Sequence, residues 1–248
     1  MTRLPPTLSR LQARVLGIAE VSPALRSALY ALYVRHYDGC DRHRFEADLA
    51  AKDHVILLHD GDQVLGFSTV ACTPFQATQG RVKVLFSGDT VIDRSAWGEQ
   101  ALTRGFAQLA GRLQAREPDV PLVWLLISKG HRTYRYLSVF ARHFHPHPQQ
   151  AHPGLQQLAA EIATARFGDA FDARRGVVAF EQSHGHLAAD MAEVPPHLQT
   201  RPEVAFFLQR NPGYRQGEEL VCLTELRADN LRSVVRAAFE LGQRDGLA

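Results

Sequence analysis

The chain has 248 residues, of which 45% are hydrophobic and 22% are charged, and its formal net charge at pH 7 is +2. This length accommodates one large domain or two small ones, with enough chain for a hydrophobic core. The composition is that of a folded protein and excludes a disordered or fibrous chain. Because acidic residues nearly match basic ones, the charge does not point to nucleic acid as a partner.

The sequence also favours a cytoplasmic protein with no membrane partner. Its longest strongly apolar run, Val120 to Ile127, has the length of a buried strand and is too short to cross a bilayer. The N-terminal MTRLPPTLSRLQ lacks the apolar centre of a signal peptide. The three cysteines, Cys40, Cys72 and Cys222, are too few and too scattered for a disulfide framework.

Two helices are expected near the N-terminus. Ser22-Pro23 is a capping hydroxyl followed by proline at the first helical position, which is a strong helix start. Apolar residues then recur at helical spacing as far as His36, and Gly39 ends the helix. A second, short helix is expected from Asp41.

An antiparallel meander of three strands is expected next, over residues 54–59, 64–71 and 81–91. Asp60-Gly61-Asp62 is a hairpin signal between the first two strands. The third strand contains Ser87-Gly88, where glycine within a strand often marks a bulge.

The middle of the chain predicts a helix, a strand and another helix. Residues 98–117 have an amphipathic stripe, residues 121–128 are apolar throughout as in a central strand, and residues 132–144 form the next helix. Weaker patterns follow beyond residue 150: a helix at 155–162, a strand at 176–180, a His- and Pro-rich loop at 181–202, a helical turn at 204–208, a strand at 219–226 and a helix at 229–241.

This order of elements resembles the GNAT superfamily of N-acetyltransferases. The matching segments are LFSGDTVIDRSAWGEQAL (85–102) and PLVWLLISKGHRTYRYLSVFARHFHP (121–146). The phrases SGDT and LISKG-x-x-TY within them are similar to those of a bacterial branch of GNAT-like proteins. The likeness extends over residues 14–147.

The resemblance implies an α/β fold. Its sheet is mixed and largely antiparallel, with a splayed parallel strand pair, and helices flank it. Residues 1–147 would form the acyl-CoA-binding core. Residues 148–248 would be a C-terminal α/β extension that completes the sheet and the acceptor side, within one structural unit.

The resemblance also implies transfer of an acetyl or other acyl group from a CoA thioester to an amine of a small molecule or peptide, without a metal. In such proteins a helix N-terminus binds the pyrophosphate of CoA, since its free N–H groups and partial positive charge suit an anion. The residues that the resemblance places at the pyrophosphate are Arg94, Ser95, Ala96, Trp97 and Gly98, and those at the pantetheine arm are Thr90, Val91 and Ile92.

The pyrophosphate loop departs from the family pattern Arg/Gln-x-x-Gly-x-Gly/Ala. Trp97 stands where the first glycine is expected, and Gly98 and Glu99 follow it. Either Gly98 takes that role one residue later or phosphate binding is altered. The departure keeps two alternatives open: an acyltransferase that uses a longer acyl chain or an acyl-carrier protein as donor, and a catalytically inactive ligand-binding or interaction module.

Three residues are candidates for catalysis within the resemblance. Asp89 would be the base or amine ligand, although a carboxylate there could equally bond the bulge backbone. Ser128 would bond the acyl carbonyl or the pantetheine arm, or cap the next helix. Tyr134 would protonate the leaving thiolate, or be an aromatic residue at the edge of the core.

The 12 histidines are the one unusual count. They cluster at residues 143–152 and 184–186, but neither group has the paired spacing and supporting ligand of a zinc site. No metal is therefore expected. Because GNAT-like proteins are often dimers, a homodimer is one expectation for the assembly.

Overall fold

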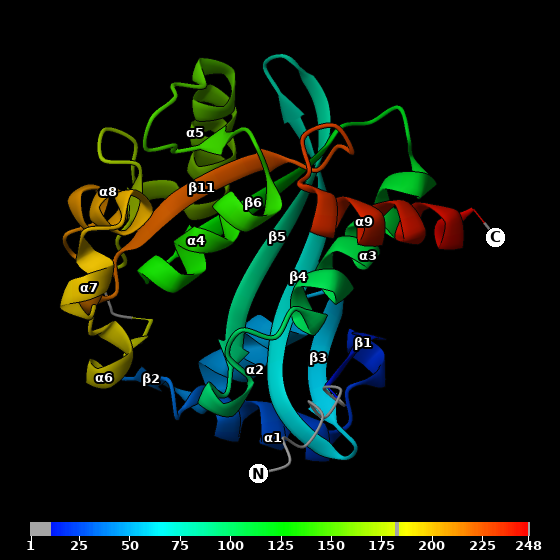
Figure 1. The fold of residues 1–248 in the computed structure, drawn as a ribbon, viewed down its shortest axis with the longest axis vertical. Helices are drawn as coiled ribbons and strands as arrows, with labels where there is room; N and C mark the ends of the chain where they lie inside the picture. The colour runs from blue at the N-terminus through cyan, green and yellow to red at the C-terminus, as the bar shows by residue number, and fades with distance from the viewer. Residues whose placement is uncertain (1–10, 182–183, 248) are drawn as a thin grey trace, which may run out of the picture.

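The computed structural model describes residues 11–181 and 184–247 (Figure 1). Its strands are β1 (Gln12–Gly17), β2 (Tyr37–Asp38), β3 (His54–Asp60), β4 (Gln63–Ala77), β5 (Gly80–Ile92), β6 (Leu122–Ser128), β7 (Phe144–His145), β8 (Phe171–Asp172), β9 (Val177–Val178), β10 (His186–Leu187) and β11 (Glu219–Glu225). Its α-helices are α1 (Pro23–Tyr33), α2 (Arg42–Ala50), α3 (Ala101–Arg116), α4 (His131–Phe140), α5 (Pro153–Phe167), α6 (Ala189–Ala192), α7 (Pro196–Gln199), α8 (Pro202–Arg210) and α9 (Ser233–Gly246).

One large sheet organises the described residues, in the strand order β1-β3-β4-β5-β6-β11-β9-β8, with β7 also paired to β11. Strands β5 and β6 are parallel, and the other neighbouring pairs are antiparallel. The expected fold class, a mixed and largely antiparallel sheet with one parallel pair and flanking helices, is therefore confirmed. A two-stranded ladder of β2 and β10 lies apart from the large sheet.

The parallel pair separates along its length. Strand β6 pairs with β5 from Lys83 opposite Leu122 as far as Ser87 opposite Leu126. Beyond Ser87, the part of the chain that the structure describes offers β5 no partner on its β6 side. The expected separation of the parallel strands is therefore present. We call it the splay: the stretch after Ser87, as far as Ile92, where β5 pairs with β4 but no longer with β6.

The expected bulge lies at the start of this unpaired stretch. Ser68 of β4 pairs with Thr90, and Val70 pairs with Ser87, so that Gly88 and Asp89 together oppose the single residue between. An extra residue on one strand bends it and redirects its side chains. The bulge thus turns β5 away from β6 and presents Asp89 at the splay.

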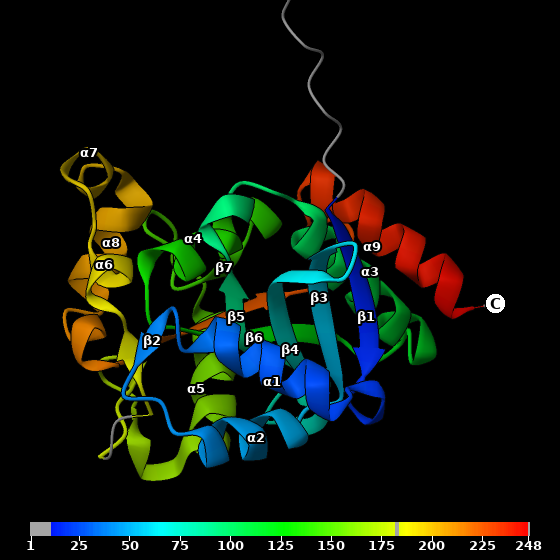
Figure 2. The same cartoon turned by 90° about the horizontal axis from the view of Figure 1, so that it is seen from below.

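Helices cover both faces of the sheet, as the alternation along β3 requires. Ile56 and Leu58 belong to the apolar cluster that includes α3 and α9, while Val55 and Leu57 belong to the cluster that includes α1 and α2 (Figure 2). Successive strand residues point to opposite faces, so a strand apolar at every position is covered on both. Within the described residues, no helix is both long and apolar enough to cross a membrane.

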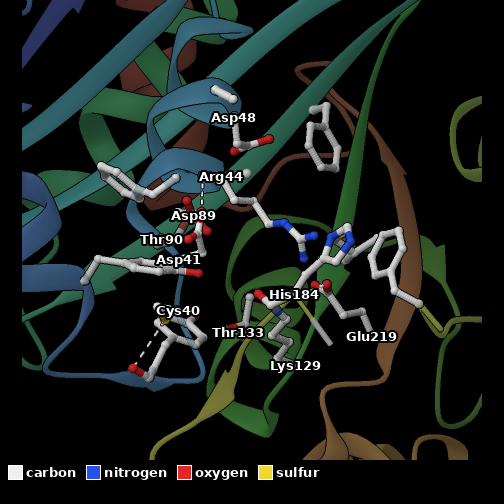
Figure 3. Close-up of a pocket in the computed structure, with 18 of the residues that line it drawn as sticks. Cys40, Asp41, Arg44, Asp48, Asp89, Thr90, Lys129, Thr133, His184 and Glu219 are labelled. Atoms are coloured by element: carbon white, nitrogen blue, oxygen red, sulfur yellow. Dashed lines mark hydrogen bonds and ion pairs between the residues drawn. The ribbon is translucent and has the colours of Figure 1, made fainter. Parts of the chain in front are cut away.

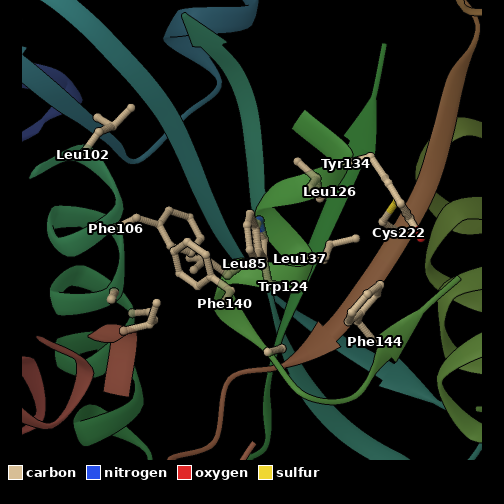
Figure 4. Close-up of a cluster of buried hydrophobic side chains, with 14 of the residues drawn as sticks. Leu85, Leu102, Phe106, Trp124, Leu126, Tyr134, Leu137, Phe140, Phe144 and Cys222 are labelled. Carbon is tan, nitrogen blue, oxygen red and sulfur yellow. The ribbon is translucent and has the colours of Figure 1, made fainter. Parts of the chain in front are cut away.

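The core of the molecule lies between β6 and the helices α3 and α4. Trp124 of β6 contacts Phe106 of α3 and Phe140 of α4, with ring centroids 4.7 and 4.8 Å away (Figure 4). The indole N–H of Trp124 donates to Ser87 Oγ at 2.9 Å. Trp124 therefore ties β6 to β5 just before the two strands part.

Several short elements differ from those expected from the sequence. Strand β1 was not expected, although residues 12–17 pair in full with β3. The helix expected over residues 132–144 is shorter, because α4 ends at Phe140 and β7 follows it. The expected loop at 181–202 contains β10, α6 and α7 in its described part.

Candidate functional site

A pocket of about 590 Å³ opens at the splay on the face covered by α1, α2 and α5 (Figure 3). We call it the acceptor pocket, after the acceptor side that the sequence resemblance leads us to expect; the name does not assign a ligand. This volume lies within the range of small-molecule sites. Its lining residues are Tyr33, Tyr37, Cys40, Asp41, Arg44, Phe45, Ala47, Asp48, Phe86, Gly88, Asp89, Thr90, Ile127, Lys129, Thr133, Arg166, Phe167, Phe180, His184 and Glu219.

Two carboxylates and a lysine occupy the floor of the acceptor pocket. Asp89 follows the bulge of β5, Glu219 begins β11, and Lys129 follows β6, so three strands meet there. Lys129 Nζ lies 3.6 Å from the Glu219 carboxylate, and both side chains are largely buried. Burial raises the pKa of Glu219, and Lys129 opposes that rise.

Asp89 has an unusual environment for a carboxyl group. Burial first, and then the charge of Asp48, raises its pKa from 3.8 to about 6, while Lys129 and Lys52 act in the opposite direction. A carboxyl group with such a pKa accepts a proton near neutral pH, as a general base must. The alternative role, a hydrogen bond from the bulge backbone to the Asp89 carboxylate, is not seen. Asp89 forms no hydrogen bond within the described chain.

A second ion pair lies under the bulge. Lys52 has a side chain only 1% exposed, and its Nζ lies 2.5 Å from the Asp48 carboxylate. The absence of a side chain at Gly88 makes room for this lysine, because a Cβ there would lie 2.7 Å from Lys52 Cε and 2.6 Å from Thr69 Oγ1. Glycine at the bulge is therefore required by close packing.

Aromatic and cationic side chains form the outer wall of the acceptor pocket. Phe180 stacks on His184 with ring centroids 3.7 Å apart. The guanidinium of Arg166, from the last turn of α5, lies 3.9 Å from the centre of the Phe86 ring. Arg44 of α2 extends into the pocket towards His184 (Figure 3).

A smaller apolar hollow of about 30 Å³ lies on the opposite face of the sheet, between α3 and α4. We call it the donor hollow. Leu102 and Thr103 of α3 and Tyr136 of α4 line it. Thr90 and Thr133 line both the donor hollow and the acceptor pocket. Both spaces therefore border the splay.

The loop expected to bind pyrophosphate satisfies most of its own N–H groups. Asp93 Oδ1 accepts from the Ser95 N–H at 3.0 Å, and the Ala96 N–H donates to Asp93 O at 2.9 Å. The Trp97 N–H donates to Arg94 O at 3.3 Å. The first main-chain bond of α3 runs from Arg104 to its N-cap Gln100. The helix N–H groups before Arg104 consequently have no intrahelical acceptor.

Gly98 is the special glycine of this loop. Its φ is +94°, a conformation that residues with a Cβ rarely adopt, and a Cβ there would meet no atom within 4 Å. Glycine is therefore favoured at residue 98 by its positive φ and not by a lack of room for a side chain. Whether Gly98 takes the phosphate-binding role expected of residue 97 stays a prediction.

Trp97 and two arginines form a layer beside the loop. Trp97 is 43% exposed, and its indole N–H donates to Ile92 O at 2.9 Å. Arg132 of α4 and Arg94 lie over its ring at 4.7 and 5.7 Å from the centroid. Arg94 is also paired with Asp190 of α6. Trp97 thus packs over its own loop and holds two cations near the start of α3.

The sequence-predicted pantetheine residues lie along the unpaired edge of β5. Thr90 bonds Ser68 through their hydroxyl groups at 2.8 Å. Val91 is buried among the α1 and α2 cluster, and Ile92 O already accepts from Trp97. Their binding to a pantetheine arm stays a prediction.

Two of the three expected catalytic residues lie away from both hollows. The Tyr134 hydroxyl donates to Pro146 O at 2.8 Å within the core, and burial raises its pKa above the usual value. Ser128 is fully buried, with its Oγ 4.0 Å from Cys222 Sγ. Only Asp89 reaches the splay, so the structure does not bring the three side chains together.

Sequence reasoning missed most of the pocket's other charges. Glu219 has a recognisable signal, since it is an acidic residue at the start of an otherwise apolar strand. Lys129 similarly ends an apolar strand. Asp48 and Arg166 lie on helices α2 and α5, whose sequences are only weakly amphipathic and do not show which side faces the sheet, so only tertiary packing reveals them.

Three histidines of residues 143–152 contact one another through their rings. In the described ranges, no group of three or more His, Cys, Asp or Glu side chains could hold a metal ion. His143 and His147 both pack against His152, with ring centroids 5.3 and 5.9 Å from it. Burial lowers the pKa of His147 and His152, and neighbouring histidines lower it further.

Neither a protein-family model nor a curated protein sequence matches this chain. Solved structures do match it. One is a conserved Enterococcus faecalis protein, a probable N-acyltransferase, at 13% identity and a TM-score of 0.41, covering 54% of this chain and 33% of that one. This chain thus spans about a third of that protein.

Two further solved structures that match this chain bear the names of N-acetyltransferases. A GNAT-family N-acetyltransferase (YhbS) from Escherichia coli, in complex with CoA, has 15% identity and a TM-score of 0.35, covering 52% of this chain and 67% of that one. A ribosomal-protein-alanine N-acetyltransferase from Brucella melitensis has 16% identity and a TM-score of 0.35, covering 48% and 79%. These are distant likenesses, and what this chain does must be judged from its own residues.

Proposed function

We propose that this chain transfers an acyl group from a CoA-type thioester to an amine. The proposal rests on two hollows that border the splay: the acceptor pocket on one face and the donor hollow on the other share the lining residues Thr90 and Thr133. A thioester arm entering from one face and an amine entering from the other would meet where β5 and β6 part. Bringing two reactants together in this way is a large part of catalysis for a bimolecular reaction.

In this proposal, Asp89 accepts the proton that the ammonium group must lose, directly or through water. The freed nitrogen attacks the thioester carbonyl carbon, the carbon–sulfur bond breaks, and the thiolate leaves with the bonding pair. Tyr136 is the α4 hydroxyl group that lines the donor hollow, so it takes the role of protonating the thiolate in place of Tyr134. Burial raises the pKa of Tyr136, so its hydroxyl group is protonated at neutral pH.

The proposed donor is acetyl-CoA or another acyl-CoA. Its pyrophosphate would lie at Gly98 and the first turn of α3, where unpaired N–H groups and the helix dipole favour an anion. Arg94 and Arg132 would add positive charge from the Trp97 layer.

Release of free thiol tests the proposal, with acetyl-CoA, longer acyl-CoA thioesters and acylated carrier protein each offered to a panel of amines. We expect turnover with acetyl-CoA and a kcat/KM that falls below about pH 6, where Asp89 takes up its proton. Asp89→Asn should lower kcat by about 100-fold, the usual size of general-base catalysis. Asp62→Asn, in the exposed β3–β4 turn, is the matched control.

Turnover only with carrier protein or a long chain would instead assign the alternative donor. The proposal fails if no donor gives thiol release and calorimetry at high protein concentration detects no binding of CoA or acetyl-CoA. That result would favour a non-catalytic binding module, consistent with the self-satisfied N–H groups of residues 95–97.

A further inference from the structure

The acceptor pocket contains two charged side chains of opposite sign, Asp89 and Arg166, that feel opposite charges nearby but are in direct contact with none in the described part of the chain. Lys129 and Glu219 form one ion pair of the pocket, and Asp48 is paired with Lys52. Among the described residues, Asp89 and Arg166 form neither a hydrogen bond nor an ion pair. Both line the same cavity, in which Asp89 is half-buried and Arg166 is exposed to solvent.

Arg166 is held in a way that leaves its hydrogen-bonding groups available. Its guanidinium lies 3.9 Å from the centre of the Phe86 ring and 6.0 Å from that of Phe167. A guanidinium that packs against aromatic rings keeps N–H donors at its edge for a planar anion such as a carboxylate. Arg44 brings a second guanidinium to the same wall (Figure 3).

Residues of β5 set the distance between the two charges, because Asp89 belongs to β5 and the Arg166 guanidinium packs on Phe86 of the same strand. Phe86, which carries Arg166, precedes Asp89 by three residues, and both side chains line the pocket. Three residues of a strand span roughly 10 Å, and the bulge between them shortens this distance. A ligand that reaches both charges needs more bonds between its own charged groups than an α-amino acid provides.

Building on the proposed function, we infer that the acceptor is an amine with an anionic group several bonds away. Its ammonium group faces Asp89, and its carboxylate or phosphate binds the Arg166 guanidinium. Such a zwitterion neutralises both ends of the pocket, whereas a plain alkylamine leaves Arg166 unpaired and an α-amino acid spans too short a distance.

A series of amines offered to the unmodified chain tests the inference. The probes are 6-aminohexanoate, 5-aminopentyl phosphate, hexylamine, 1,6-diaminohexane and alanine. We expect kcat/KM for 6-aminohexanoate or the aminoalkyl phosphate to exceed that for hexylamine by about tenfold or more, as a charge-assisted hydrogen bond predicts. The better of the two identifies the anion. Equal values for hexylamine and both zwitterions, or a preference for the diamine or alanine, would overturn the inference.

Arg166→Gln locates the anion site. This substitution should reduce the preference for the zwitterion over hexylamine to about one, and Arg166→Lys should retain part of it because the charge remains. Arg42→Gln is the control, since Arg42 also carries charge over an aromatic ring, that of Tyr30, but does not line the pocket. A preference that survives Arg166→Gln would exclude Arg166 as the anion site, so the inference would fail.

Binding without a thioester separates this inference from the proposed function. Calorimetry should show tighter binding of 6-aminohexanoate than of hexylamine, and Arg166→Gln should abolish the difference. If this result is obtained but no donor gives thiol release, the ligand site stands and acyl transfer fails. If thiol is released equally with all amines, acyl transfer stands and the inference fails.

Discussion

Asp89 connects the local sequence to the chemistry of the site. Gly88 permits the bulge, the bulge presents Asp89 at the splay, and burial raises its pKa to about 6. The Asp89 carboxyl group keeps its proton up to about pH 6 in the folded chain but loses it near pH 3.8 in the unfolded chain. Between these two pH values the folded chain therefore binds more protons than the unfolded chain. Stability therefore falls as pH rises through this window, and the whole penalty remains above it.

This penalty predicts that Asp89→Asn stabilises the fold in a pH-dependent way. The variant should gain about 3 °C in thermal midpoint at pH 7.5 and much less at pH 4.5, because only the ionised carboxylate is penalised by burial. Circular dichroism melts at the two pH values provide the measurement, with Asp62→Asn as control. An equal gain at both pH values would show that the environment of Asp89 does not disfavour its charge.

Gly88 carries a second prediction at this scale. A Cβ at this position would come within 2.7 Å of Lys52 Cε, so Gly88→Ala should displace the buried lysine from beneath the bulge. Overpacking of this kind costs about 1–3 kcal/mol in the free energy of unfolding. Urea unfolding measures the loss, and Gly61→Ala in the β3–β4 turn, where a Cβ meets no atom but φ is +55°, separates packing from backbone strain.

At the scale of elements, the patterns that depend on neighbours in the sequence predicted structure well. The apolar run of β6, the helical stripe of α3 and the Asp-Gly-Asp turn after β3 all occur as expected. Strand β1 was missed because QARVLG has too few apolar residues to be recognised without its partner β3. Glu219, Lys129 and Arg166 converge only through pairing and packing of distant elements, which no local pattern contains.

The contact between α6 and the Trp97 loop makes a prediction about the donor site. Asp190 of α6 is paired with Arg94 and would compete with a phosphate for the same guanidinium. Both side chains are more than half exposed, so the pair is weak and Asp190→Ala should tighten CoA binding only about two- to fivefold. Calorimetry with CoA measures this, and Glu240→Ala, which breaks a remote pair on α9, is the control. Weaker CoA binding would show instead that Asp190 positions Arg94.

At the scale of the whole molecule, the two halves of the chain share one sheet and one helical layer. Strand β11 pairs with β6 from Leu220 opposite Ser128 to Glu225 opposite Val123, and α9 packs on α3. The helices approach so closely that a Cβ at Gly242 would lie 1.9 Å from Gln108 O. Residues after 147 also supply Glu219, Arg166 and His184 to the acceptor pocket. The site and the fold therefore both depend on the C-terminal part.

These shared contacts predict that the chain unfolds as a single cooperative unit. Trp97→Phe leaves Trp124 of β6 as the sole tryptophan, since the sequence has two, so its fluorescence reports on the N-terminal half alone. Far-UV circular dichroism reports on all helices, and the two guanidinium midpoints should coincide. Gly242→Ala, which forces α9 away from α3, should lower both midpoints together. A Trp124 transition that is unmoved by Gly242→Ala, or that separates from the circular dichroism transition, would show that residues 1–147 fold independently.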